Sequence, residues 1–203
     1  MENEGGGLTP DDLIDPQEIA ALEQTYGPFP HQYYSLTVGP VHLEFWEKAL
    51  HDRRGEVVLV VQRASQEVLL HTKTFYPSGT YRLPSGGISW GEAASEALQR
   101  EAYEETGFTT WNEQLLGLVS YDFQGSGRSL PFVSYVFLLT DVKGQPAAQD
   151  EDERISDFRW TPVSELPTVA ATLRSLPADS PGRQDWGRFR ALIHDFVVER
   201  LFF

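Results

Sequence analysis

Residues 86–108 (GGISWGEAASEALQREAYEETGF) constrain this chain more than any other stretch of its sequence. Seven chemically specific residues stand there at fixed intervals: Gly86, Glu92, Arg100, Glu101, Glu104, Glu105 and Gly107. Because each residue type makes up about 5–7% of an average protein, seven such matches would arise by chance with a probability on the order of 10⁻⁹. The motif therefore indicates a defined local structure with a chemical role.

The motif predicts a helix that starts near Ser89 and ends before Gly107. Ser89 and Glu92 have the spacing of a capping box, in which each side chain satisfies a backbone N–H at the helix start. Gly107 can adopt the left-handed conformation that ends many helices. One side of the helix is small and apolar, which allows close packing on a sheet: Ala93, Ala94, Ala97, Leu98 and Ala102.

The other side of the predicted helix is acidic near its C-terminal end. Glu101, Glu104 and Glu105 are three or four residues apart, so they project from neighbouring positions. They repel each other and lie at the negative end of the helix dipole, which costs stability unless a cation is bound. Carboxylate oxygens suit Mg²⁺ or Mn²⁺, ions that also bind phosphate oxygens. The pattern predicts metal-dependent hydrolysis of a diphosphate.

Two further residues of the motif have supporting roles in this interpretation. Arg100 precedes Glu104 by four residues, so its guanidinium can hold that carboxylate in a ligating orientation. Gly86 is expected in the loop before the helix, where a missing side chain lets the backbone approach a metal. The alternative is a solvated acidic helix with a surface pair worth ~0.3–0.5 kcal/mol, which leaves the spacing as coincidence.

The motif matches the Nudix box, and the chain resembles the Nudix hydrolases. The resemblance implies an α/β fold, the Nudix-type α/β/α sandwich with a mixed β-sheet, and a metal contact from the Gly86 carbonyl. It also implies cleavage of a nucleoside diphosphate linked to another moiety, such as a nucleotide sugar, ADP-ribose, a dinucleotide or a nucleoside triphosphate. Ser85 departs from the family, which often has glycine there, and we expect this to alter loop flexibility only.

The expected metal ligands are Gly86, Glu101, Glu104 and Glu105, and the expected catalytic residues are Glu101, Arg100 and Glu153. In some relatives the general base is an acidic residue outside the box. Residues 150–153 (DEDE) offer such a residue, and Glu153 is nearest the following strand. A solvated acidic loop is the alternative.

Substrate contacts are less well specified by the sequence. Tyr121 and Phe123 could stack on a base, and Arg128 could contact a phosphate; the alternative is packing within a hairpin and a solvated arginine. Isoprenoid diphosphate isomerisation is disfavoured, because its family uses a cysteine and this chain has none. A Nudix-fold nucleotide sensor or interaction module without turnover is the second function considered. Degraded glutamates would favour it, whereas every box glutamate is present.

The order of apolar segments predicts a mixed sheet packed between helices. Residues 1–32 are expected to form a flexible or loosely docked acidic extension containing one short helix, followed by a Nudix domain at 33–203 with its core at about 54–170. Strands are expected at 56–62, 68–71, 80–83, 114–121, 132–139 and 155–160, a turn at 52–55, and a C-terminal helix at about 184–201. Residues 44–50 fit either a helix or a strand.

Charge and composition limit the partners of the chain. Thirty acidic and 16 basic residues give a net charge of −14, which disfavours long nucleic acids and leaves a small nucleotide as the expected substrate. No stretch is long and apolar enough to suggest a membrane span or a signal peptide. The absence of cysteine is compatible with a cytoplasmic location. The apolar stripe at residues 189–203 could pack in the core or in a homodimer.

Overall fold

The structure, a computed structural model, describes residues 8–202 and contains two β-sheets. The larger sheet has five strands in the order β1 (His31–Thr37), β5 (Asn112–Gly125), β6 (Arg128–Thr140), β2 (Arg53–Val61) and β4 (Ser85–Ser89). Strand β1 is parallel to β5 and β2 is parallel to β6, whereas β5–β6 and β2–β4 are antiparallel. Strands β3 (Glu67–Lys73) and β7 (Ile155–Pro162) form a separate antiparallel pair. The predicted mixed sheet is confirmed.

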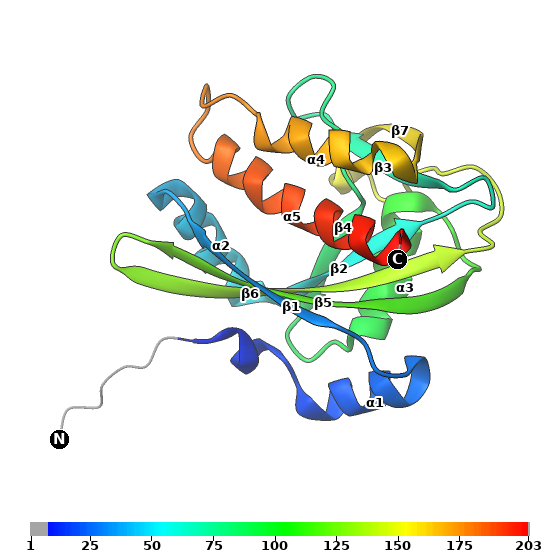
Figure 1. Ribbon diagram of the computed structural model, residues 1–203, viewed down its shortest axis with the longest axis horizontal. Helices are drawn as coiled ribbons and strands as arrows, with labels where there is room; N and C mark the ends of the chain where they lie inside the picture. Colours follow the sequence, from blue (N-terminus) through cyan, green and yellow to red (C-terminus); the bar gives the residue numbers. More distant parts are fainter. Residues whose placement is uncertain (1–7, 203) are drawn as a thin grey trace.

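Helices cover both faces of the larger sheet (Figure 1). On one face lie α2 (Pro40–Asp52), α4 (Leu166–Arg174) and α5 (Arg183–Leu201). On the other lie α1 (Pro16–Tyr26) and α3 (Ala94–Thr106). Short 3-10 turns span Pro10–Leu13, Glu151–Glu153 and Val163–Glu165. This is the α/β/α sandwich that the resemblance implies.

The central strands are apolar on both sides because both sides are covered. In β2, Val58 packs in the cluster that contains Phe189 of α5, whereas Val57 packs in the cluster that contains Leu98 of α3. Both valines are at most 1% exposed. Alternate residues of a strand face opposite ways, so a continuous β-branched run is what a doubly covered strand requires.

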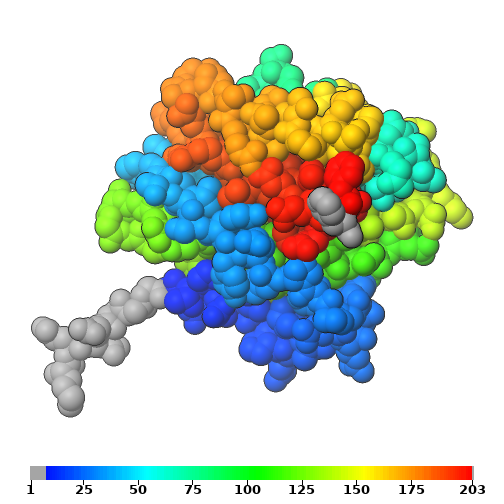
Figure 2. All heavy atoms as spheres, viewed as in Figure 1, coloured from blue at the N-terminus to red at the C-terminus, as the bar shows by residue number. Residues whose placement is uncertain are grey.

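The described part of the predicted N-terminal extension is packed rather than loose. Leu13 and Leu22 are buried at 1% and 6% exposure, and the Glu18 carboxylate lies 2.8 Å from the Arg54 guanidinium. Figure 2 shows this blue segment seated against the lower part of the molecule. The proposed boundary after residue 32 falls inside β1. The first seven residues of the extension lie outside the described part of the chain, and the division into extension and domain remains a prediction.

The structure corrects two of the secondary-structure predictions and resolves the alternative left open for residues 44–50. Residues 44–50 are helical, within α2. Residues 53–55, predicted as part of a turn, already belong to β2. Residues 80–83 form no strand, and Arg82 makes a single bridge to His71. No helix in residues 8–202 is both long enough and apolar enough to cross a membrane.

The motif helix begins five residues later than its predicted start. Gly91 has a φ of 82°, and the Glu92 carboxylate accepts from the Ser89 N–H at 2.9 Å, so these residues close a turn. The helix itself starts at Ala94, where Glu96 accepts from the Ala93 N–H at 3.0 Å. The left-handed end at Gly107, with a φ of 73°, is as predicted.

Candidate active site

Strand β4 and helix α3 approach each other closely at Gly86 and Glu101. The sequence predicts Gly86 in a loop, but in the structure it lies in β4, where it pairs with Val57. A Cβ atom placed on Gly86 would lie 1.7 Å from the Glu101 carboxylate carbon and 1.8 Å from Oε2. Only glycine therefore allows this carboxylate to lie against the strand. Glu101 is 5% exposed, and its Oε2 has no hydrogen-bond partner among the described residues.

Arg100 holds the acidic side chains of the motif in place. Its Nη1 donates to Glu101 at 2.7 Å and to Glu104 at 3.1 Å. Its Nε and Nη2 donate to the two oxygens of Glu92 at 2.9 and 3.0 Å, and Nη2 also reaches the Gly87 carbonyl at 2.8 Å. The guanidinium therefore links three motif carboxylates to strand β4. This geometry supports the predicted positioning role.

Glu105 and Glu153 meet at Lys73, the last residue of β3. The Lys73 ammonium lies 2.9 Å from Glu105 and donates to Glu153. The pairing of β3 with β7 brings residue 153 here, because the Thr74 N–H donates to the Arg154 carbonyl at 2.9 Å. The structure thus places Glu153 with the motif carboxylates. Its catalytic role stays a prediction.

Burial and mutual repulsion shift the protonation of this cluster. Burial raises the pKa of Glu105 to about 7, and neighbouring carboxylates add to the rise while Lys73 opposes it. Burial also raises the pKa of Glu101, against the opposing effect of Arg100. Burial alone would raise the pKa of Glu153, but the Lys73 ammonium outweighs it and lowers that pKa. Burial is therefore the main cause of both raised pKa values, because it disfavours the charged carboxylates of Glu101 and Glu105.

The donor set fits a hard divalent cation. The Glu101 Oε2 atom and both Glu105 oxygens are buried without a hydrogen bond among the described residues, and the contact of Glu105 with Lys73 is an ion pair. As the side chains lie, no three His, Asp or Glu groups within residues 8–202 converge on one metal position, because Arg100 and Lys73 hold several oxygens. Mg²⁺ typically takes one or two carboxylates and completes its shell with water and phosphate. The available oxygens match that requirement.

Two basic side chains near this cluster, the buried His71 and the partly buried Lys73, were missed in the sequence. His71 and Lys73 are two residues apart on β3, so they share one face, and His71 Nδ1 lies 4.0 Å from Glu105. Burial lowers the pKa of His71 well below its usual value, so the ring is neutral. Strand alternation from 68 onward is the signal that could have found both residues. That signal could not supply their carboxylate partners, Glu105 of α3 and Glu153 of the turn before β7.

Ser85 does more than alter a loop. It is a buried residue of β4 whose hydroxyl donates to Glu56 at 3.0 Å and accepts from Arg82 at 3.0 Å. Glu56 in turn pairs with Arg190 of α5 at 2.7 Å. The departure from glycine therefore connects β4 to a buried charge network under α5.

The predicted substrate contacts do not reach the acidic cluster. Tyr121 and Phe123 are both 0% exposed in the core under α5, so the prediction that they stack on a base is wrong and the packing alternative holds. Arg128 lies at the β5–β6 hairpin and pairs with Glu47 at 2.6 Å. Tyr121 and Phe123 alternate along a strand of the hairpin, and this alternation does not indicate which face of the strand a helix covers.

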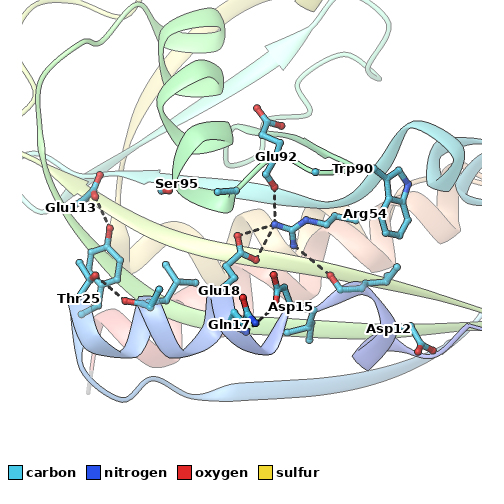
Figure 3. A pocket seen from close by; sticks show the side chains of 17 residues that line it. Asp12, Asp15, Gln17, Glu18, Thr25, Arg54, Trp90, Glu92, Ser95 and Glu113 are labelled. Carbon is cyan, nitrogen blue, oxygen red and sulfur yellow. Dashed lines mark hydrogen bonds and ion pairs between the residues drawn. The ribbon is translucent and has the colours of Figure 1, made fainter.

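A cavity of about 820 Å³ lies between the N-terminal segment and the turn before α3. Figure 3 shows the Arg54 guanidinium there, between the Glu18 carboxylate and the Glu92 backbone. Arg54 also donates to the Leu13 carbonyl and the Tyr135 hydroxyl, so its charge is already satisfied. The cavity lacks the motif carboxylates at 101, 104 and 105 among its lining residues.

Known proteins resemble this chain in both sequence and fold. It is 30% identical to an NAD-capped RNA hydrolase NudC of Haemophilus influenzae over 59% of this chain and 45% of that protein. It is 25% identical to an oxidized purine nucleoside triphosphate hydrolase of Danio rerio, over 70% of this chain and 89% of that protein. The chain thus spans less than half of the NudC relative.

A solved structure and a family model complete the comparison. The mMutator MutT protein of Bacillus halodurans superposes with a TM-score of 0.51 at 23% identity, over 70% of this chain and 80% of that chain, which shows a shared fold. The model of the NUDIX domain matches residues 50–179, which include the whole motif and Glu153. This protein therefore belongs to the NUDIX domain family.

Proposed function

We propose that this protein is a metal-dependent hydrolase that cleaves the diphosphate linkage of a nucleoside diphosphate joined to another moiety. The observation that carries the proposal is the Glu101 carboxylate, which lies against Gly86, is held by Arg100, and keeps one buried oxygen without a partner among residues 8–202. An unpaired buried carboxylate oxygen is costly, so folding tolerates it where a ligand completes it.

Glu101, Glu104, Glu105 and the backbone of Gly86 would hold the cation, Mg²⁺ or Mn²⁺. When bound, such an ion neutralises charge on phosphate oxygens and makes a bound water more acidic. Arg100 keeps Glu101 and Glu104 oriented, through hydrogen bonds of 2.7 and 3.1 Å. Lys73 balances part of the negative charge, since it contacts both Glu105 and Glu153.

Glu153 is our choice for the group that accepts a proton from the attacking water. Its side chain is 26% exposed, so water can reach it, whereas Glu105 is fully buried. Lys73 lowers its pKa, so the carboxylate is ionised and able to accept a proton at neutral pH.

The names of the relatives favour a nucleotide substrate. One acts on NAD-capped RNA and another on oxidized purine nucleoside triphosphates, and both names specify nucleotides. The net charge of −14 disfavours a long polyanion, so a small nucleotide is the substrate class proposed here.

The test is a substrate panel with Mg²⁺ or Mn²⁺ that includes ADP-ribose, NADH, nucleoside triphosphates and dinucleoside polyphosphates. The parent should release product from at least one, and Glu101→Gln, Glu104→Gln and Glu105→Gln should each lower kcat by about 10²-fold or more. Equal turnover by the parent and all three variants would contradict the metal site.

Glu153→Gln tests the proton acceptor separately. The expected result is a lower kcat with an unchanged fold by circular dichroism. Unchanged kinetics would remove Glu153 from the mechanism while leaving the metal site in place.

The second candidate is a sensor that binds a nucleotide without turnover. It would replace the hydrolase if the whole panel resists cleavage while one compound binds tightly. The retained carboxylates favour hydrolysis, because a sensor has no need for them.

A further inference from the structure

A second cavity, of about 250 Å³, lies between α2, the loop after β3 and the loop before α5. Five large aromatic side chains line it: Phe45, Trp46, Phe75, Tyr76 and Trp186. These residues come from three separate parts of the chain. Phe45 and Phe75 are 59% and 60% exposed, so large apolar rings stand in solvent at the cavity. Exposed rings grouped around a hollow are a feature of ligand sites.

The rings are arranged so that flat faces are available. Trp186 and Tyr76 have centroids 4.9 Å apart at 52°, and Phe75 meets Tyr76 edge to face at 5.0 Å. Because these rings meet at an angle rather than face to face, they do not cover each other's faces completely. Aromatic faces bind planar rings by stacking, and each stacked base contributes ~1–3 kcal/mol in proteins that bind single strands.

His42 supplies a polar group to the same cavity. Its Nε2 accepts from the Trp46 indole at 2.9 Å, and because an indole can only donate, the proton of the neutral ring lies on Nδ1. Burial lowers the pKa of His42 to about 4, so the ring is neutral at pH 7. Among residues 8–202 this is the one hydrogen bond that the His42 ring makes. The Nδ1–H is not one of the fully buried side-chain atoms without a partner in residues 8–202, so this donor is accessible to a ligand although His42 as a whole is only 4% exposed.

Tyr76 joins this cavity to the acidic cluster. Its ring lines the cavity, while its hydroxyl accepts from Arg82 Nε at 2.7 Å. The same ring lies 6.4 Å from His71, whose Nδ1 is 4.0 Å from Glu105. Lys73, which contacts Glu105 and Glu153, is only three residues before Tyr76. One short loop therefore forms a wall of both sites.

We propose that the aromatic cavity holds the nucleobase of the substrate while its diphosphate lies at the acidic cluster. This inference rests on the proposed function and deepens it, because it names the part of the substrate that sets specificity. Stacking on the exposed ring of Phe75 recognises a planar ring, with Tyr76 and Trp186 packed beside it, and the His42 N–H is matched by a base carbonyl or ring nitrogen. A sugar or an alkyl chain would use neither feature.

Phe75→Ala is the main test, with Phe202→Ala as the matched control, since Phe202 is 50% exposed and lies outside the cavity. Binding of AMP, GMP, CMP and UMP is measured by tryptophan fluorescence in metal-free buffer, with ribose 5-phosphate as the probe that lacks a base. At least one monophosphate should bind the parent, with Kd raised about tenfold by Phe75→Ala and unchanged by Phe202→Ala. Ribose 5-phosphate should bind all three proteins equally weakly.

Trp186→Leu provides a second variant, on α5 at the same cavity, and it should raise Kd by a similar factor. Kinetics with the best substrate of the panel should show a higher KM and a nearly unchanged kcat for Phe75→Ala. If neither Phe75→Ala nor Trp186→Leu changes the Kd for the nucleoside monophosphates or the KM of the substrate, the cavity assignment is overturned, even if hydrolysis is intact. Conversely, an inactive parent that still binds a base through Phe75 would support the cavity and overturn the hydrolase.

Discussion

Ser85 and Gly86 are neighbours in β4, and each lies against a different buried glutamate: Glu56 at Ser85 and Glu101 at Gly86. Behind Ser85, both oxygens of Glu56 are satisfied: they accept from Arg190 at 2.8 and 2.7 Å, from Ser134 at 2.8 Å and from Ser85 at 3.0 Å. Beside Gly86, Glu101 keeps one buried oxygen without a partner among the described residues. Both carboxylates are at most 5% exposed, so burial does not distinguish them.

The difference lies in how each charge is balanced. Burial alone would raise the pKa of Glu56, but Arg190, Arg82 and the Ser134 hydroxyl outweigh it and lower that pKa, as in a structural ion pair. At the acidic cluster the pKa values of Glu101 and Glu105 are raised instead, because burial and like charges outweigh Arg100 and Lys73. The fully hydrogen-bonded pair of Glu56 and Arg190 connects α5 to the sheet. The carboxylates of Glu101 and Glu105 lack such partners among the described residues, which is the arrangement expected of a cation site. Three substitutions and the addition of Mg²⁺ test this contrast.

Arg190→Leu should have the largest effect on stability. Removing one partner of a buried ion pair leaves the other charge unpaired, which typically costs ~3–5 kcal/mol. Urea unfolding followed by circular dichroism measures the change. The control is Arg188→Leu on the same helix, where the ion pair with Asp185 is exposed and the expected loss is below about 1 kcal/mol. Similar losses for both variants would contradict the structural role of Arg190.

Gly86→Ala should destabilise the protein by ~2–3 kcal/mol, because the new methyl group would overlap the Glu101 carboxylate. The carboxylate must then move, so the response of the protein to Mg²⁺ should also be lost. Gly87→Ala is the matched control: the nearest atoms to its Cβ are 3.2 Å away on the flexible Arg53 side chain. A Gly86→Ala protein that keeps its Mg²⁺ response would show that this close contact does not shape the site.

Glu105→Gln in metal-free buffer should stabilise the protein at pH 8 by about 2 kcal/mol relative to the parent. The folded pKa of about 7 exceeds the usual 4.5, so the parent loses stability as pH rises through this window. Near pH 4.5 and below, the carboxyl is protonated in both states and the advantage should largely disappear. Thermal unfolding with EDTA measures it, with exposed Glu44→Gln as the control. A difference that does not depend on pH would contradict the raised pKa.

Mg²⁺ should produce the smallest effect of the four. At tenfold above its dissociation constant, a ligand that binds only the folded state adds about 1.4 kcal/mol. The parent should show this gain in thermal unfolding, and Glu101→Gln should show less. Arg188→Leu should respond as the parent does, because its charge lies outside the cluster. Equal gains for the parent and Glu101→Gln would place the bound ion elsewhere.

The sequence predicted the acidic side of α3 because its information is local. Spacings of three and four residues fix which side chains share a helix face, and this holds whatever the helix packs against. The same reasoning predicted Arg100 beside Glu104, which the structure shows at 3.1 Å. It failed at the start of the helix, since Gly91 closes a turn that the capping pattern of Ser89 and Glu92 also fits.

Contacts between distant segments could not be predicted in this way. Lys73 reaches Glu153 because β3 pairs with β7 in one particular register, and Tyr121 is buried because α5 covers that face of the sheet. A shift of one residue in a strand exchanges its two faces, so alternation alone leaves open which side chains are covered. The aromatic cavity likewise combines residues from three regions of the chain.

The sequence alone determined the family, the carboxylates at 101, 104 and 105, and the arginine that orients them, because helical geometry and motif spacing are short-range properties. The tertiary structure decided that, within residues 8–202, Glu101 keeps an oxygen without a partner while Glu56 does not. It also decided that Glu153 and Lys73 join the acidic cluster. These outcomes depend on strand register and on which helix covers which face, and the free energy of packing the whole chain sets both.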